Sequence, residues 1–366
     1  MTYVIKDINI KGFRSYKEGK IELDPNLTII YGLNAAGKTN IIEALQLLTS
    51  GKSFRSSKRT DFINWECDKS SLEMTAFDNN LKKNVSINIY PEKRDVYING
   101  KYVRSLHDLS SNIPSVIFIP DDLKIIKESS HRRRQEIDNL GIQLSSTYSR
   151  LLSEYKKIII QRNKLLKDEQ YGSQIFYAWT ERMVEVGIAL INKRISLFNN
   201  LYEPLISLYK EISSGSNKEQ NLDLIYKYSW GTSQNYESII EKIKEKEFEE
   251  RSRRQSLIGP HCDDLIFEIN SKSARSFASQ GQQRSIAIAW KLAQLLVIER
   301  ISHKKPLLLL DDIMSEFDKD RRHYLLNVID NFAQTVITTA NIDYFEQDVI
   351  EKSKVLLIPD DIQILR

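Results

Sequence analysis

Cysteine is scarce in this 366-residue sequence, which contains only Cys67 and Cys262 and no Cys-x-x-Cys pair. Neither a disulfide framework nor a cysteine-based zinc site is therefore expected, in keeping with a reducing compartment. No apolar stretch approaches the roughly 18 residues that a membrane helix needs, and residues 1–16 lack the apolar core of a signal peptide. We therefore expect a soluble, cytoplasmic protein with no membrane partner.

A strong charge of one sign is missing as well, because 53 basic and 49 acidic residues leave a net charge of +4. This balance does not by itself indicate a nucleic-acid partner, although it is compatible with a local basic patch. Hydrophobic residues make up 41% and charged residues 28% of the chain, the balance of a globular protein with a core. The length suits two domains, or one domain with a large insertion.

The clearest chemical motif is a P-loop of the form G-x-x-x-x-G-K-T. It follows an apolar run over 27–31 that predicts a buried strand, and it precedes a helical pattern over 39–49 that stops at Gly51. Such a loop turns its N–H groups toward phosphates, its lysine reaches the β- and γ-phosphates, and its threonine hydroxyl binds Mg²⁺. The strand–loop–helix context argues against an accidental glycine loop. The predicted ATP-binding residues are Gly32, Leu33, Asn34, Ala35, Ala36, Gly37, Lys38 and Thr39, with Lys38 also catalytic and Thr39 also a metal ligand.

Two carboxylates follow a second apolar run, Leu307 to Leu310, which predicts a buried strand. Asp311 is predicted to hold Mg²⁺, directly or through water, as in the Walker B arrangement. Asp312 is predicted to orient and deprotonate the attacking water. One such aspartate could simply cap a helix, but two of them together with an upstream P-loop favour the catalytic interpretation.

A third motif, Ser-Gln-Gly-Gln-Gln-Arg over 279–284, stands at the start of a predicted helix about 30 residues before the Walker B strand. Small and amide side chains at a helix N-terminus can form an anion site. The same letters could also be only a cap and a turn. Its position about 30 residues before the Walker B strand favours the interpretation as an anion site.

The pattern along the chain predicts an α/β fold with a helical insertion. Strand signals dominate both ends, whereas apolar residues in the middle recur every three or four positions, the helical period. A hairpin turn is expected at Asn99-Gly100. We predict one ATPase lobe formed by 1–124 and 251–366, interrupted by an all-helical lobe over 125–250.

In this order, the P-loop, the serine–glycine–glutamine signature, Walker B and a D-loop over 315–318 resemble the ABC-type ATPase heads of the SMC group. Within that group the chain is similar to the RecF family of bacterial recombination and repair ATPases. The stretches that carry this resemblance span nearly the whole chain: 12–16, 37–40 with 43–44, 51–55, 118–123, 132–134, 161–167, 259–261 with 263–265, and 279–284.

The resemblance implies a mechanism and partners. Heads of this group dimerise face to face, with each nucleotide between one P-loop and the signature of the other copy, so Ser279, Gly281 and Gln282 would act in trans. Arg14, Ser15 and Asn40 match residues near the nucleotide. The family binds duplex, gapped and junction DNA and acts with RecO and RecR to help load RecA, in DNA repair, replication restart and the SOS response. Hydrolysis is slow, weak and DNA-stimulated.

Basic residues that could contact DNA phosphates cluster in two places. A solvated face or pairing within the chain is the alternative, and for the second cluster ion pairs with nearby acids at helical spacing are equally compatible. The candidates are Arg55, Lys58 and Arg59 in the first cluster and Arg132, Arg133 and Arg134 in the second.

Several departures from the resembled pattern affect the hydrolysis residues more than the binding residues. The family usually has glycine where this chain has Ala35, and transporter-type signatures have glycine where it has Gln280. Asp121 and Asp122 stand where a Q-loop glutamine is expected, and no switch histidine follows 336–341, where Thr339 or Asn341 could replace it.

Other classes of P-loop protein fit less well. A transporter ATPase would show the Q-loop glutamine and the switch histidine. A condensin-type protein needs a far longer arm, and a GTPase needs an Asn-Lys-x-Asp motif. The remaining alternative is a nucleotide-gated DNA clamp, or another SMC-like ATPase, with little hydrolysis.

Overall fold

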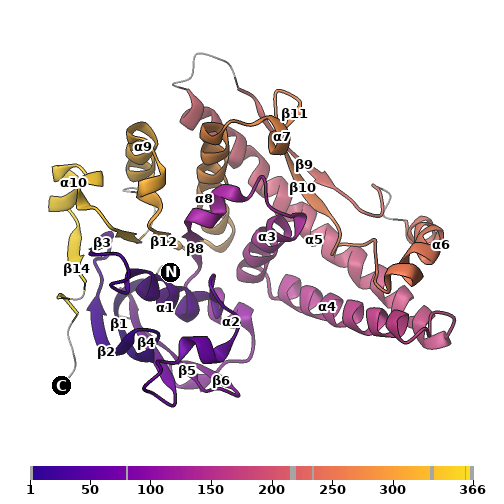
Figure 1. Ribbon diagram of the computed structural model, residues 1–366, viewed down its shortest axis with the longest axis horizontal. Coiled ribbons are helices and arrows are strands. Elements are labelled where there is room, and N and C mark those ends of the chain that lie inside the picture. The colour runs from indigo at the N-terminus through magenta and orange to yellow at the C-terminus, as the bar shows by residue number, and fades with distance from the viewer. Residues whose placement is uncertain are drawn as a thin grey trace. The chain divides into compact units, whose positions relative to one another are not determined.

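The computed structural model describes residues 3–79, 81–214, 220–232, 235–329, 334–358 and 360–362. By packing, the chain divides into two compact units, the first formed by 1–123 with 284–366 and the second by 124–283 (Figure 1). The lobe boundaries predicted at 124 and 250 refer to domains that fold independently, which is a different property from packing. They therefore stay a prediction. Among the described residues, no helix combines the length and the apolar character needed to cross a bilayer.

The first unit contains a six-stranded antiparallel sheet in the order β2-β1-β4-β5-β6-β7. Alternating buried and exposed residues mark these strands, as expected for a sheet with one face on a core. The predicted turn at Asn99-Gly100 is confirmed, since both residues have positive φ and the flanking Ile98 and Lys101 are paired. The strands are β1 (Val4–Phe13), β2 (Tyr16–Glu22), β4 (Ser70–Asp78), β5 (Leu81–Ile89), β6 (Arg94–Ile98) and β7 (Lys101–Tyr102).

A five-stranded parallel sheet in the order β14-β3-β13-β12-β8 completes the framework of this unit. All five residues of β12 and of β13 are buried, which explains the continuous apolar runs in their sequences. The strands are β3 (Leu27–Tyr31), β8 (Ser115–Phe118), β12 (Leu307–Asp311), β13 (Thr335–Thr339) and β14 (Lys354–Leu357).

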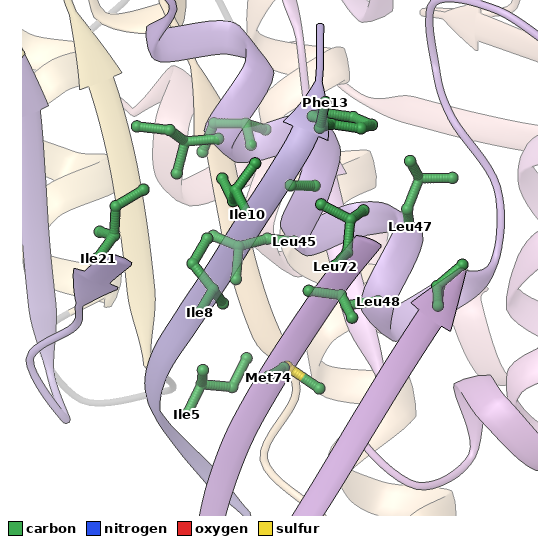
Figure 2. Packing of buried hydrophobic residues seen from close by; sticks show 14 of the residues in the cluster. Ile5, Ile8, Ile10, Phe13, Ile21, Leu45, Leu47, Leu48, Leu72 and Met74 are labelled. Carbon is green, nitrogen blue, oxygen red and sulfur yellow. The ribbon is translucent and has the colours of Figure 1, made fainter. Parts of the chain in front are cut away.

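Helix α1 (Lys38–Ser50) packs against strands of both sheets and forms the centre of the core. Figure 2 shows Leu45, Leu47 and Leu48 of this helix among apolar side chains of β1 and β4. Burying each such side chain contributes about 2 kcal/mol. Gly51 ends the helix in the left-handed region at φ +68°, as the sequence predicts. The core therefore fixes the direction of the helix that follows the P-loop.

Shorter helices complete the first unit. They are η1 (Arg59–Phe62), α2 (Leu106–Ser110), η2 (Pro120–Lys124), η3 (Ile313–Glu316), α9 (Lys319–Ile329), η4 (Ile342–Tyr344) and α10 (Gln347–Glu351). The boundary between the units at residue 283 falls near the start of α8 (Gln280–Ser302).

The second unit is built on long helices. The spacing of apolar residues in the sequence predicts helices over about 175–208 and 236–254, and both are confirmed as α5 (Gln174–Ser213) and α6 (Tyr236–Arg253). The helical pattern predicted over 129–200 is interrupted between α3 (Ser130–Leu144) and α4 (Ser146–Lys167). Ser145 is extended there, and its side chain accepts a hydrogen bond from the Tyr148 N–H to cap α4.

The prediction that 125–250 is all-helical is wrong in one respect. Strand β9 (Leu222–Lys227) lies inside this range and pairs with β10 (Asp264–Ile269), which pairs with β11 (Lys272–Ser273). Alternate residues of β9 are buried, the period of a strand. A short helix, α7 (Ala274–Phe277), follows β11. The α/β fold class with a largely helical second part is otherwise confirmed.

Candidate nucleotide-binding site

The P-loop connects β3 to α1, and both of its glycines are required by its geometry. Gly32 has φ +153°, and a Cβ there would lie 2.4 Å from the Ile358 carbonyl oxygen. Gly37 has φ +101°, and a Cβ there would lie 2.6 Å from the Tyr16 hydroxyl. Gly37 is also the N-cap of α1, where no side chain caps the helix. The first amides of α1 are thus left to bind an anion.

Lys38 is held in the loop by two backbone oxygens. Its buried Nζ donates hydrogen bonds to the carbonyls of Gly32 and Leu33, each at 2.8 Å. Burial lowers the pKa of Lys38, while the charges of Asp312 and Asp311 act in the opposite direction. The ammonium group therefore lies close to both Walker B carboxylates, in position to receive a phosphate.

The tip of the loop is open to solvent. Leu33, Asn34 and Ala35 are exposed, and Leu33 retains 84% of its accessible surface. Ala35 has φ +66°, so this alanine adopts a conformation that glycine adopts without strain. The departure noted in the sequence thus has a structural cost.

Asp311 ends β12 between two threonine hydroxyls. The Thr338 hydroxyl donates to Asp311 Oδ1 at 2.7 Å, and Thr39 also forms a side-chain hydrogen bond with this carboxylate. Burial raises the pKa of Asp311, and the two hydroxyls oppose that rise. Hydroxyl and carboxylate oxygens are the ligands that Mg²⁺ prefers. Thr39 and Asp311 are therefore brought together as the predicted metal ligands.

Asp312 has a buried oxygen without a partner. Its Oδ1 forms no hydrogen bond among the described residues, although its carboxylate accepts one from the Ala340 N–H. The backbone is left-handed at φ +49°, a region that aspartate visits more readily than most residues. Burial raises the pKa of Asp312, and the Lys38 charge opposes the rise. An unpartnered buried oxygen beside a P-loop lysine fits a water or a hydrated metal ion.

Arg14, Ser15 and Asn40 form a cluster at the first turn of α1. The Asn40 Nδ2 donates to Ser15 Oγ at 2.8 Å. The Arg14 guanidinium forms two hydrogen bonds with Glu43, at 2.9 and 2.6 Å. Arg14 is therefore paired within the chain in this structure rather than extended into solvent.

The signature residues lie in the second unit at the start of α8. The Ser279 N–H donates to the side-chain oxygen of Gln282 at 2.8 Å, and the Gln282 N–H donates to Ser279 Oγ at 3.2 Å. This reciprocal pair is a capping box. Gly281 is half-buried within the first turn, while Ser279 itself is exposed. Cap and anion site are compatible, because an exposed serine hydroxyl retains acceptor and donor capacity.

The first cluster of DNA candidates lies on the loop after α1. Lys58 and Arg59 are exposed, and the Arg59 Nε donates to the Pro91 carbonyl at 3.2 Å. Arg55 is directed instead toward α1, where its Nη1 donates to Asn40 Oδ1 at 2.8 Å. Arg55 thus lies beside the nucleotide-binding loop.

In the second cluster of DNA candidates, the prediction is wrong for Arg133. Arg133 is only 4% exposed and pairs with both oxygens of Asp264 while donating to three backbone carbonyls, so it is not available to DNA. It satisfies the loop that joins η2 to α3. Arg134 is half-buried and donates to the Asp263 carbonyl, and Arg132 is half-buried as well. The alternative of pairing within the chain holds for Arg133.

Sequence reasoning missed two residues of the site, Thr338 and Glu43. Thr339 and Asn341, the predicted replacements for the switch histidine, are hydrogen-bonded to each other. The Thr339 hydroxyl donates to the Asn341 carbonyl at 3.0 Å. Thr338, one position earlier, contacts Asp311. Strand alternation after a buried run could have identified it, since neighbouring residues face opposite sides. A buried glutamate on an apolar helix face was the available signal for Glu43.

Asp122, at the expected Q-loop position, has a structural role. It is 1% exposed, pairs with Lys291 at 3.1 Å and accepts a hydrogen bond from the Ile119 N–H.

Comparison with known proteins agrees with the resemblance to the RecF family. A family model described as the RecF/RecN/SMC N-terminal domain matches residues 4–357. The DNA replication and repair protein RecF of Lachnoclostridium phytofermentans is 33% identical over 356 residues, which cover 96% of this chain and 97% of that protein. RecF of Bacillus cytotoxicus is 33% identical over 362 residues, with 96% of each chain covered.

Solved structures agree with the sequence comparison. The structure of the recombination mediator protein RecF with ATP, from the RecFOR pathway, matches with a TM-score of 0.89 at 29% identity, covering 100% of this chain and 98% of that one. The Smc head domain of Pyrococcus furiosus matches with a TM-score of 0.54 at 16% identity, covering 100% and 96% of the two chains. The second likeness shows a shared fold only.

Proposed function

The chain belongs to the RecF family, and from this premise we propose that it is an ATP-hydrolysing, DNA-binding protein of repair and recombination. The observation that carries the proposal is the convergence of Lys38, Thr39, Asp311 and Asp312, in which one buried oxygen of Asp312 has no partner within the described part of the chain. A phosphate-binding loop next to such an oxygen is the arrangement that hydrolysis requires.

Each residue of this group has a defined part. Lys38 and the first amides of α1 bind the phosphates. Thr39 and Asp311 would hold Mg²⁺, and the bound ion would neutralise charge on the phosphates. Asp312 orients a water and takes its proton. The raised pKa of Asp312 favours this role, because a base accepts a proton more readily when its pKa lies nearer neutrality.

A second copy of the chain completes the site. Ser279, Gly281 and Gln282 contact the γ-phosphate of the ATP bound by the partner, so that ATP closes a dimer on DNA. The exposed Ser279 at a helix N-terminus supports this assignment, because its hydroxyl and the nearby amides can face an anion. The chain then acts with RecO- and RecR-type mediators at duplex, gapped or junction DNA to help load RecA. Hydrolysis is slow, DNA-stimulated and resets the dimer.

The phosphate-binding step is tested with Lys38→Arg. A guanidinium is larger than an ammonium and cannot occupy the same space between two carbonyls. We expect ATP affinity, measured by fluorescent-nucleotide binding, to fall at least about tenfold, which corresponds to about 1.4 kcal/mol. Nucleotide-dependent DNA binding should fall with it.

The exposed Lys11→Arg is the matched control, since Lys11 lies on β1 and pairs with Glu18. It should bind ATP like the wild type. Unchanged ATP affinity in Lys38→Arg would contradict the assignment. DNA binding that depends on ATP without measurable phosphate release would support the clamp alternative.

A further inference from the structure

A single buried carboxylate in the first unit binds two arginines. Glu43, on α1, has no exposed surface. Arg14 forms hydrogen bonds with both of its oxygens, and Arg55 Nη1 lies 3.5 Å from its Oε2. The Ser53 hydroxyl donates to Glu43 Oε1 at 2.5 Å. Glu43 therefore joins the turn between β1 and β2, which carries Arg14, to the basic loop over 52–59.

The two arginines are held with different strength. Arg14 is anchored in three ways, because its guanidinium is bidentate on Glu43, its N–H donates to the Phe62 carbonyl, and its Cζ lies 5.2 Å from the centre of the Phe62 ring. Arg55 has a longer ion pair and a side chain that is 44% exposed. Bidentate charged pairs are stronger than single, exposed ones. Arg55 is thus the arginine that a competing anion can remove.

The competing anion would arrive at the P-loop. Arg55 also donates to Asn40, one residue beyond Thr39, and its charge is close enough to oppose the burial-driven rise in the pKa of Asp311. Two guanidinium groups on one carboxylate leave a positive charge unbalanced in this cluster. A phosphate offers Arg55 a second anionic partner, because two of its oxygens can accept hydrogen bonds from the planar guanidinium group.

The conformation of the basic loop depends on the same cluster. The Ser53 hydroxyl that donates to Glu43 also accepts hydrogen bonds from the N–H groups of Arg55 and Ser56, at 3.0 and 3.2 Å. The turn that leads to Lys58 and Arg59 is therefore built on a group bound to Glu43. Arg55 contacts this cluster twice, through its guanidinium on Glu43 and through its backbone N–H on the Ser53 hydroxyl.

We propose that Glu43 is a positioning residue that couples the nucleotide site to the basic loop. ATP binding draws Arg55 away from Glu43, and the loop then presents Lys58 and Arg59 to DNA phosphates in a changed position. By reciprocity, DNA held by the loop favours ATP. This inference rests on the proposed function, because it requires both ligands to bind.

The test measures the affinity for fluorescent duplex DNA with and without a non-hydrolysable ATP analogue. For the wild type we expect the analogue to change DNA affinity by about 5- to 150-fold, the usual range of allosteric coupling. Glu43→Gln keeps the size of the side chain and removes its charge, and we expect the ratio of the two affinities to fall close to one. A variant that is only less stable would keep the wild-type ratio, because both affinities are corrected for the folded fraction measured by thermal melting.

Glu154→Gln is the matched control, because Glu154 pairs with Arg182 at the surface of the second unit. Its ratio should equal that of the wild type. Arg55→Gln should also lower the ratio, and this exposed position tests the inference if Glu43→Gln fails to fold. A wild-type ratio in both variants would overturn the coupling role and leave the proposed function intact. A ratio of one in the wild type would overturn both.

Discussion

At the scale of single residues, the P-loop combines one sequence departure with a demanding backbone. Gly32 and Gly37 occupy positions where a Cβ would collide with neighbouring atoms. Ala35 instead carries a side chain at φ +66°. The sequence predicted the loop because its letters are tied to a fixed geometry, whereas the strain at Ala35 became measurable only in the folded backbone.

Ala35→Gly should stabilise the protein. The left-handed conformation costs a non-glycine residue about 1–2 kcal/mol, and glycine removes most of that cost while adding some backbone entropy to the unfolded chain. We expect the free energy of unfolding to rise by about 0.5–1 kcal/mol in urea titration, with ATP affinity equal to or higher than that of the wild type. A lower stability would contradict the strain at this position.

Asp312→Asn should separate binding from hydrolysis. The amide keeps the shape of the side chain but cannot accept a proton, and general bases contribute about 10²–10⁴-fold to a rate. We expect phosphate release to fall by at least about 100-fold while ATP affinity stays within a few-fold. Asp320→Asn, on the exposed face of α9, is the control. If Asp312→Asn lowered ATP affinity and phosphate release by the same factor, Asp312 would act in ATP binding and not as the base for hydrolysis.

At the scale of elements, the half-buried His261 ties the turn over 256–264 to helix α4. The Ser256 carbonyl can only accept, so His261 Nε2 carries the proton and donates to it at 3.1 Å, while Nδ1 accepts from the Tyr155 hydroxyl at 2.9 Å. Burial lowers the pKa of His261 to about 4, the Ser256 hydrogen bond opposes the shift, and the charges of Arg134, Arg162 and Arg194 add to it.

This histidine should make stability pH-dependent on the acid side. Between pH 6.5 and about 4 the unfolded chain binds a proton at His261 that the folded chain does not, so stability rises with pH through this window. The contribution at neutral pH is about 3 kcal/mol, lost progressively toward pH 4. His261→Gln should therefore show a smaller drop in the free energy of unfolding between pH 7 and pH 4.5. An unchanged pH slope would contradict the neutral, buried state of the ring.

The sequence indicated most elements but not all of their limits. Apolar residues at helical spacing predicted α5 and α6 within a few residues, because one face of each helix is buried. The helical spacing of apolar residues also continues across Ser145, because the apolar faces of α3 and α4 follow each other in phase. The sequence pattern therefore does not show where α3 ends and α4 begins. Strand β9 was missed because six residues within a charged region give a weak alternation. Local patterns could single out the positions of Thr338 and Glu43 but not their partners, because the contacts with Asp311 and Arg14 join residues far apart in the chain.

At the scale of the whole molecule, the motifs that we propose as the two halves of an ATP site lie in different compact units. The P-loop and Walker B residues lie in the first unit, and the capped signature lies in the second. On the proposed function, the two halves meet only between copies of the chain. The predicted lobes, 1–124 with 251–366 and 125–250, remain a proposal about independent folding that limited proteolysis can test.

We propose that ATP joins two copies of the chain through the signature, and light scattering with saturating ATP, with and without gapped DNA, measures this step. We expect the wild-type mass to double from 42.6 kDa with ATP. Ser279→Arg places a bulky side chain at the exposed signature position, and this variant should still bind ATP but stay at the mass of one chain. Wild-type protein that remains at the mass of one chain under saturating ATP and DNA would contradict the shared site.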